Sequence, residues 1–152
     1  RTTADMALYV REAIDARDAG TALPFLVESM TSGAAIGCTR FGNIVRPHLR
    51  LEIGWTWITP SYQGSAVNTE MKLLMFDHAF SELGMNRVEF KTDARNQRSQ
   101  LALERIGATR EGVLRKHMIV QGNFARDSVY FSVIDTEWPQ VKERLLLLAE
   151  RA

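Results

Sequence analysis

The chain has 152 residues, of which 45% are hydrophobic and 24% charged, and this length and composition predict one globular domain with its own core. Nineteen Lys and Arg against eighteen Asp and Glu leave a net charge of +1, which argues against nucleic acid or an anionic membrane as partner. The one cysteine, Cys38, excludes an intrachain disulfide and is typical of a reducing compartment. Apolar runs are too short to span a membrane and the start shows no signal peptide pattern, so we expect a cytoplasmic protein.

The first part of the chain predicts a helix followed by two strands. A helix is expected over residues 4–19, capped by Thr2 or Thr3. Its expected buried stripe consists of Met6, Val10, Ala13 and Ile14. The apolar segments 22–28 and 35–41 flank a Ser-Met-Thr-Ser-Gly turn and therefore predict a hairpin.

A strand and a long helix are predicted next, joined by a tight turn. Period-two alternation over residues 50–58 predicts a strand with one apolar face, formed by Leu51, Ile53, Trp55 and Trp57. We expect both tryptophans in the core, and lining a substrate cleft is the alternative. Residues 59–66 break regular structure, and helical spacing then runs from Val67 until Gly84 ends the helix. The expected buried stripe consists of Leu73, Phe76, Phe80 and Leu83, widened by Met71, Met75 and Ala79.

The rest of the chain predicts a second strand and helix, a hairpin and a last helix. Strand 87–92 follows a helix, so it should lie parallel to strand 50–58 through a right-handed crossover. The later elements are a helix between Asn96 and Gly107, a hairpin of residues 112–120 and 124–134, and a helix over 137–150. This order predicts a mixed α/β fold with helices on both faces of one sheet.

The turn before the long helix has the features of an anion-binding site. Gly64, Ser65 and Ala66 are small and leave the N–H groups at the helix start unshielded. Free N–H groups and the positive end of the helix dipole favour phosphate. Taken by itself, the same pattern also fits an ordinary turn before a core helix.

Together these segments resemble the GCN5-related N-acetyltransferase (GNAT) superfamily, and more narrowly its branch of ribosomal-protein N-terminal acetyltransferases. The resemblance extends from about Ala22 to Arg144 and rests on LEIGWTW, the turn with VNTEMKLL, NQRSQLALERIGATREGVLRKHM and RDSVYFSVIDTEWP. It implies a mostly antiparallel mixed sheet whose two central parallel strands splay apart and admit the pantetheine arm of acetyl-CoA. The superfamily normally has a further strand and helix at the start, so we expect residues 1–152 to be a single acetyltransferase domain that is N-terminally incomplete.

The resemblance also implies how acetyl-CoA, the expected co-substrate, is held without a metal. The superfamily pattern Gln/Arg-x-x-Gly-x-Gly/Ala reads Gln63-Gly64-Ser65-Ala66-Val67-Asn68 here, and its N–H groups should hold the diphosphate. Ala66 stands in place of a glycine and adds a methyl group where the phosphate approaches. Asn96 matches the asparagine that hydrogen-bonds the pantetheine arm, and it can also cap its helix. The expected cofactor-binding residues are Trp57, Ile58, Gln63, Gly64, Ser65, Ala66, Val67, Asn68, Thr69, Asn96 and Ser99.

Two residues, Glu52 and Ser99, are expected to carry the chemistry. Glu52 matches the Glu of a family Glu-Ile-Gly segment and can accept the amine's proton, often through a water; pairing with Lys91 or an arginine is the alternative. Ser99 is the candidate for protonating the thiolate, because Leu103 stands where many relatives have tyrosine; a buried serine bonded to a helix carbonyl is the alternative. Some ribosomal-type relatives place a glutamate on the late hairpin, where this chain has His117, a possible substitute base.

The resulting hypothesis is direct acetyl transfer in a ternary complex to a protein N-terminal α-amine or a small-molecule primary amine. The alternative is a catalytically weak or inactive CoA-binding module that acts as a sensor or scaffold, which Ala66, Leu103 and the absent hairpin glutamate favour. A homodimer through hairpin 112–134 and the leucine-rich tail is a further expectation. The histidines and Cys38 do not have the spacing of metal ligands. The sequence also lacks the Walker A, Gly-x-Ser-x-Gly and Gly-x-Gly-x-x-Gly patterns.

Overall fold

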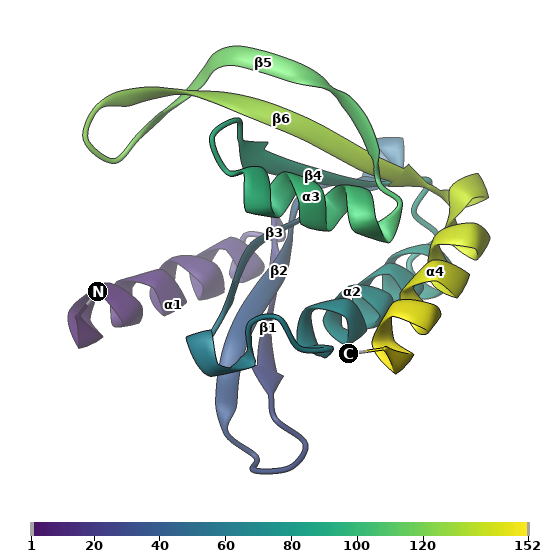
Figure 1. The fold of residues 1–152 in the computed structure, drawn as a ribbon. Helices are drawn as coiled ribbons and strands as arrows, with labels where there is room; N and C mark the ends of the chain where they lie inside the picture. The colour runs from purple at the N-terminus through teal and green to yellow at the C-terminus, as the bar shows by residue number, and fades with distance from the viewer. Residues whose placement is uncertain (1, 152) are drawn as a thin grey trace.

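A six-stranded mixed sheet forms the centre of the computed structural model, which describes residues 2–151 (Figure 1). The strands are β1 (Leu23–Glu28), β2 (Ala35–Val45), β3 (Arg50–Ile58), β4 (Arg87–Asp93), β5 (Thr109–Val120) and β6 (Phe124–Ile134), in the spatial order β1-β2-β3-β4-β6-β5. Neighbouring strands are antiparallel, except β3 and β4, which are parallel. The expected mixed α/β sheet and its parallel crossover are therefore confirmed.

Helices lie on both faces of the sheet, as expected. Within the described residues the α-helices are α1 (Thr3–Asp18), α2 (Val67–Asp77), α3 (Gln97–Ile106) and α4 (Trp138–Glu150). Phe41 of β2 belongs to the core that α2, α3 and α4 share, whereas the neighbouring Arg40 contacts Tyr9 of α1. Successive strand residues point to opposite faces, so α1 covers one face and the other three helices cover the second. Figure 1 shows α1 set apart from α2 and α4.

The core lies between the sheet and the helices α2, α3 and α4. Its fully buried side chains include Phe41, Leu51, Phe76, Val88, Phe131 and Leu145, each at 0% exposure. Burial of each such side chain stabilises the fold by about 1.5–3 kcal/mol. This apolar layer fixes the positions of β3, β4 and the start of α2, which carry the candidate site.

The buried stripe of α2 differs in part from the expected one. Met75 and Phe76 are buried as expected, but Leu83 is 39% exposed. A π-helical turn (η3, His78–Glu82) follows α2. A π turn inserts a residue into the helical period, so the apolar stripe changes phase before Leu83.

Helix α1 meets the sheet through a different side from the one expected. The predicted stripe is confirmed at Ala13, which is buried, and was wrong at Val10 and Ile14, which are 46% and 38% exposed. These two line an open apolar groove on the outer side together with Thr3, Met6, Ala7 and Arg11. The sheet side instead carries Tyr9, whose hydroxyl donates to the Trp55 carbonyl at 3.0 Å. The spacing of apolar residues predicted the helix correctly. Because α1 has two apolar sides, that spacing does not determine which of them packs against the sheet.

Strand β3 carries a β-bulge that changes the faces of its tryptophans. Trp55 has φ +51°, and the pairing of β3 with β2 shifts register at this point. The side-chain alternation restarts after such a bulge. Trp55 is 44% exposed and Trp57 is half-buried, so the expectation that both lie in the core was wrong. No helix among residues 2–151 is long and apolar enough to span a membrane.

Candidate active site

Strands β3 and β4 separate partway along their length. In the described chain they pair at Arg50–Arg87, Leu51–Val88 and Glu52–Glu89. Both strands continue beyond this point, β3 to Ile58 and β4 to Asp93, with their facing edges unpaired. We call this gap between strand edges the notch; it is closed at Glu52 and Glu89. Its unpaired backbone groups can bind an extended ligand that carries amides, and the expected splay is confirmed.

The turn that leads from β3 into α2 presents free N–H groups at the open end of the notch. In the part of the chain that the structure describes, no acceptor is found for the N–H groups of Gly64, Ser65, Ala66 and Asn68. Ala66 is the N-cap of α2 and has no side-chain cap. Four unshielded donors at a helix start are able to bind an anion.

The two ends of the expected diphosphate segment use their N–H groups within the turn itself. The Gln63 N–H donates to the Pro60 carbonyl at 3.2 Å, and the Thr69 N–H donates to the Ala66 carbonyl at 2.8 Å. The Val67 N–H is 3.4 Å from the Ser65 hydroxyl. The donors left for a ligand are therefore concentrated between Gly64 and Asn68.

Side chains link the turn to the start of α3. The Gln63 amide donates to the Ile58 carbonyl at 2.8 Å, and Arg98 donates to the Gln63 side-chain oxygen at 3.0 Å. Arg98 thus brings an exposed guanidinium next to the free N–H groups. This places a positive charge beside the anion site.

Asn96 and Ser99 lie in the first turn of α3, as expected. The Asn96 side-chain oxygen accepts the Ser99 N–H at 3.1 Å, so the capping role of Asn96 is confirmed. Ser99 is half-buried, and among residues 2–151 its hydroxyl has no hydrogen-bond partner. The alternative of a serine bonded to a helix carbonyl is therefore not what the structure has.

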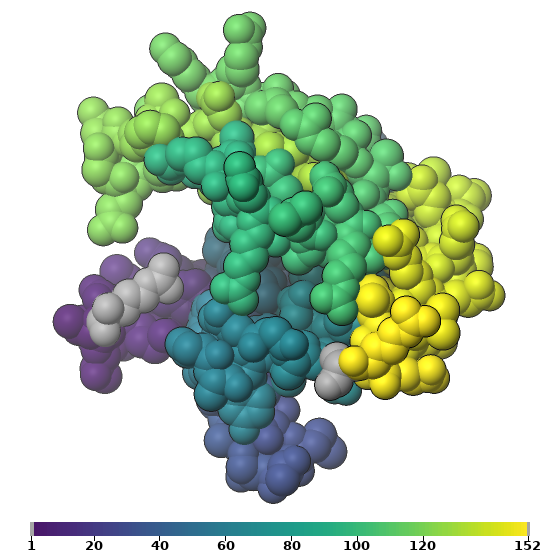
Figure 2. All heavy atoms as spheres, viewed as in Figure 1, coloured from purple at the N-terminus to yellow at the C-terminus, as the bar shows by residue number. Residues whose placement is uncertain are grey.

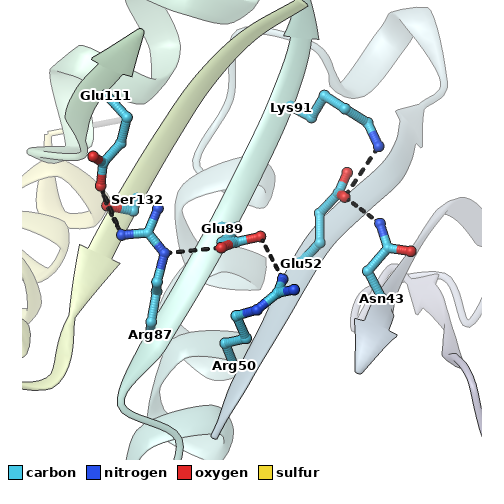
Figure 3. Close-up of polar contacts among 8 residues, drawn as sticks. All are labelled: Asn43, Arg50, Glu52, Arg87, Glu89, Lys91, Glu111 and Ser132. Atoms are coloured by element: carbon cyan, nitrogen blue, oxygen red, sulfur yellow. Dashed lines mark hydrogen bonds and ion pairs between the residues drawn. The ribbon is translucent and has the colours of Figure 1, made fainter. Parts of the chain in front are cut away.

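Glu52 lies at the closed end of the notch and is 4% exposed. Its Oε2 accepts hydrogen bonds from Asn43 Nδ2 at 2.7 Å and from Lys91 Nζ at 3.3 Å (Figure 3). Its Oε1 lies beside Gly54, where an added Cβ would be 3.1 Å away, and it has no hydrogen-bond partner in the described chain. The Lys91 pairing that was the alternative role is present, and one carboxylate oxygen remains free.

A separate chain of ion pairs lies beside Glu52 on the same face of the sheet (Figure 3). Glu89 pairs with Arg50 at 3.1 Å and with Arg87 at 2.9 Å, and Arg87 pairs with Glu111 at 2.7 Å. Hydrogen bonds from Ser132 and Arg87 lower the pKa of Glu111. The network was not predicted, although the period-two spacing of Arg87, Glu89 and Lys91 indicated one charged face of β4.

Tyr130 and His117 lie beside this charged face. Tyr130 of β6 is opposite Lys91 in register, and burial followed by the charges of Glu52 and Glu89 raises its pKa. The His117 Nδ1 is 3.1 Å from the Ser128 hydroxyl, and its ring meets Tyr130 edge-on at 5.7 Å. The neutral phenol of Tyr130 is a candidate hydrogen-bond donor that sequence reasoning missed.

On the α1 face, an aromatic and cationic cluster borders the bulge of β3. The Arg40 guanidinium lies 4.9 Å from the Tyr9 ring and 5.1 Å from the Trp55 ring, and Arg40 is 6% exposed. Figure 2 shows an open hollow near α1, below the overhanging β5–β6 hairpin. Sequence reasoning missed this cluster because the bulge at Trp55 creates it.

These features fit a coenzyme with a diphosphate and an amide-bearing arm. The free N–H groups suit the diphosphate, and the unpaired strand edges suit the amides. The Trp57 indole N–H is buried and has no partner in the described chain, so a ligand acceptor can satisfy it. Among residues 2–151 no cluster of His, Cys, Asp and Glu could hold a metal ion.

Comparisons with known proteins agree with this geometry. Residues 1–109 match the family model described as an acetyltransferase (GNAT) domain. The Bacillus subtilis protein YdaF, which carries the name of a ribosomal N-acetyltransferase, is 32% identical over 106 residues, 70% of this chain and 57% of its own length. The chain spans about half of the curated relatives it matches, with 57%, 50% and 48% of their lengths covered.

Solved structures show the same fold. A GCN5-related N-acetyltransferase from Brucella melitensis is 31% identical with a TM-score of 0.87, covering 96% of this chain and 64% of that one. RimJ from Mycobacterium smegmatis, solved in complex with CoA-disulfide, is 25% identical with a TM-score of 0.80. The match covers 94% of this chain and 68% of the RimJ chain.

Proposed function

The chain belongs to the GNAT family, and on this premise we propose that it is an N-acetyltransferase that moves the acetyl group of acetyl-CoA directly to a primary amine. The observation that carries the proposal is the notch between β3 and β4, with free N–H groups at its open end and Glu52 at its closed end. The acceptor is a protein N-terminal α-amine or a small-molecule amine, and the name carried by YdaF supports the first class.

The cofactor is proposed to run from the turn into the notch. The N–H groups of Gly64 to Asn68 hold the diphosphate, and Arg98 adds a charge there. The edge at Trp57 and Ile58, together with Asn96 and Ser99, orients the arm. When bound, acetyl-CoA supplies an activated acetyl thioester. The chain's own contribution is to hold that thioester beside Glu52 in the geometry of attack.

Glu52 is proposed to take the proton from the attacking amine, directly or through a water. Its Oε2 is held by Asn43 and Lys91, which fixes the carboxylate, while Oε1 is free to accept. The backbone N–H groups near the Trp55 bulge are proposed to stabilise the negative charge on the carbonyl oxygen during attack. The half-buried Ser99 hydroxyl is free to donate a hydrogen bond near the sulfur.

The test is to measure coenzyme A binding by calorimetry and thiol release from acetyl-CoA with pools of amines and peptides. We expect CoA to bind and an amine-dependent release of thiol. Binding without amine-dependent thiol release would favour the CoA-binding module that acts as a sensor or scaffold. No heat of binding at millimolar CoA would show that the proposal is wrong.

A further inference from the structure

Lys72, the sixth residue of α2, is a buried cation without an anionic partner. It is 6% exposed, and in the described chain it forms no ion pair or hydrogen bond. Its Nζ lies 5.0 Å from the centroid of the Phe90 ring. Burial lowers the pKa of Lys72 to about 8. Buried charges are expensive unless they are paired, so an anion that arrives with a ligand would explain why this lysine is here.

The contact with Phe90 places the Lys72 ammonium at the closed end of the notch. Phe90 directly follows Glu89, the last residue of β4 that pairs with β3. Phe90 belongs to the core on the α2 and α3 face, as does Leu103, which is 6% exposed. Glu52 points to the opposite face, where Lys91 binds it. A lysine and a glutamate therefore flank the closed end from opposite sides of the sheet.

The diphosphate of a cofactor is too far away to be that anion. It is expected at the turn after Ile58, at the other end of the notch. From Ile53, beside the closed end, to Ile58 the strand rises about 16 Å at ~3.3 Å per residue. The group that reaches the closed end is instead the reactive end of the arm, and the anion formed there is a thiolate.

We propose that Lys72 meets the sulfur of acetyl-CoA and gives its proton to the departing thiolate; this rests on the proposed acetyltransferase function. The amine nitrogen bonds to the acetyl carbon and its proton passes to Glu52. The carbon–sulfur bond breaks with its electron pair on sulfur, and Nζ supplies the proton that makes the thiol. Glu52 then releases its proton to solvent and Lys72 regains one, so both groups return to their starting states.

Two observations support this assignment over Ser99 alone. A neutral serine hydroxyl donates a hydrogen bond but is a poor source of a proton, and Leu103 has no proton to give. An ammonium whose pKa lies near 8 is well matched to a thiol, whose ordinary pKa is roughly 8.5, so the proton transfer is nearly balanced. Ser99 is left to orient the sulfur.

The first test compares CoA with desulfo-CoA, which lacks the thiol, by calorimetry at pH 8, where about half of Lys72 carries its proton and part of the thiol is ionised. We expect Lys72→Met to weaken CoA binding about tenfold, the effect of one lost charge contact, and to leave desulfo-CoA binding unchanged. Lys142→Met is the matched control, because Lys142 binds Asp77 of α2 at 2.6 Å outside the notch, and it should change neither affinity. Equal losses for both ligands, or none, would overturn the proposal. Failure of the unmodified protein to bind CoA would instead overturn the proposed function.

The second test separates charge from proton donation. Lys72→Arg keeps a cation that cannot lose its proton, so it should keep the preference for CoA over desulfo-CoA but lower kcat about a hundredfold, with little change in the KM for acetyl-CoA. Ser99→Ala should lower kcat by less than Lys72→Met does. A larger loss for Ser99→Ala, or full activity in Lys72→Arg, would contradict proton donation by Lys72.

Discussion

At the scale of single residues, Glu52 has two oxygen atoms with different surroundings. Oε2 is bound by Asn43 and Lys91, while Oε1 faces Gly54 without a partner among residues 2–151. The first oxygen fixes the side chain, and the second is available to a substrate. One oxygen can therefore hold the side chain in place while the other accepts a proton, so the two roles considered for Glu52 are compatible.

Glu52→Gln should lower kcat by about 10²- to 10⁴-fold, because the amide cannot accept a proton, while CoA affinity stays the same. The measurement is steady-state kinetics with calorimetry of CoA binding. Glu89→Gln is the control, since Glu89 lies on the same face but is engaged by Arg50 and Arg87. Similar losses in both variants would mean that the charge network, and not a base, is responsible.

The buried Lys72 predicts a stability that rises with pH. Its folded pKa of about 8 lies below its ordinary 10.5, so above pH 8 the unfolded chain binds more protons than the folded one. The free energy of unfolding should therefore increase by about 2 kcal/mol between pH 8 and 9.5. Lys72→Met should remove this increase, as measured by urea unfolding at several pH values. If the variant kept the same increase in the free energy of unfolding with pH, the increase would come from other titrating groups.

At the scale of elements, α2 combines an uncapped start with a buried middle. Ala66 provides no side-chain cap, so the first N–H groups stay free, and an anion bound to them would act as the missing cap. The same helix holds Lys72 against β4. One element thus connects the open and closed ends of the notch.

Ala66→Asp should stabilise the free protein by about 0.5–1 kcal/mol, because a carboxylate at the N-cap satisfies N–H groups and interacts with the helix dipole. It should also weaken CoA binding at least tenfold by competing with the diphosphate. Ala66→Asn caps without the charge and should weaken binding less. Thermal unfolding and calorimetry measure the two effects; unchanged affinity in Ala66→Asp would place the diphosphate elsewhere.

The close approach of β2 to the end of β3 requires glycine at position 37. A Cβ there would lie 2.4 Å from the Trp57 carbonyl oxygen, a backbone atom. Gly37→Ala should therefore destabilise the protein by about 1–3 kcal/mol. Gly112→Ala meets nothing within 4 Å and should be close to neutral in the same chemical unfolding experiment. Equal free energies of unfolding for the two variants would mean that β2 and β3 can move apart at position 37 without loss of stability.

At the scale of the whole molecule, the two faces of the sheet differ. Three helices cover one face with an apolar core, whereas α1 covers part of the other, which carries the charged network. At one edge, β5 has an unpaired side and exposed apolar residues, namely Val113, Leu114, Met118 and Ile119. Such an edge favours pairing with a second strand.

The homodimer expected from the hairpin stays a prediction. Size-exclusion chromatography with light scattering should give a mass that rises with protein concentration, and Ile119→Lys should return it to that of one chain. Ile119 is 66% exposed, so the substitution should leave the fold unchanged. A mass of one chain at all concentrations would exclude the dimer.

The sequence by itself determined the kinds of elements, their order and the parallel crossover. These follow from local chemistry: apolar spacing, the Asn96 cap and the glycines that end helices depend on neighbours along the chain. The free N–H groups at Gly64 to Asn68 were predictable for the same reason. The tertiary structure decided which apolar side of α1 packs, where β3 bulges, and that Lys72 is buried against Phe90. Those features depend on contacts between segments distant in sequence, and a one-residue change of register or helical phase sends each following side chain to another face.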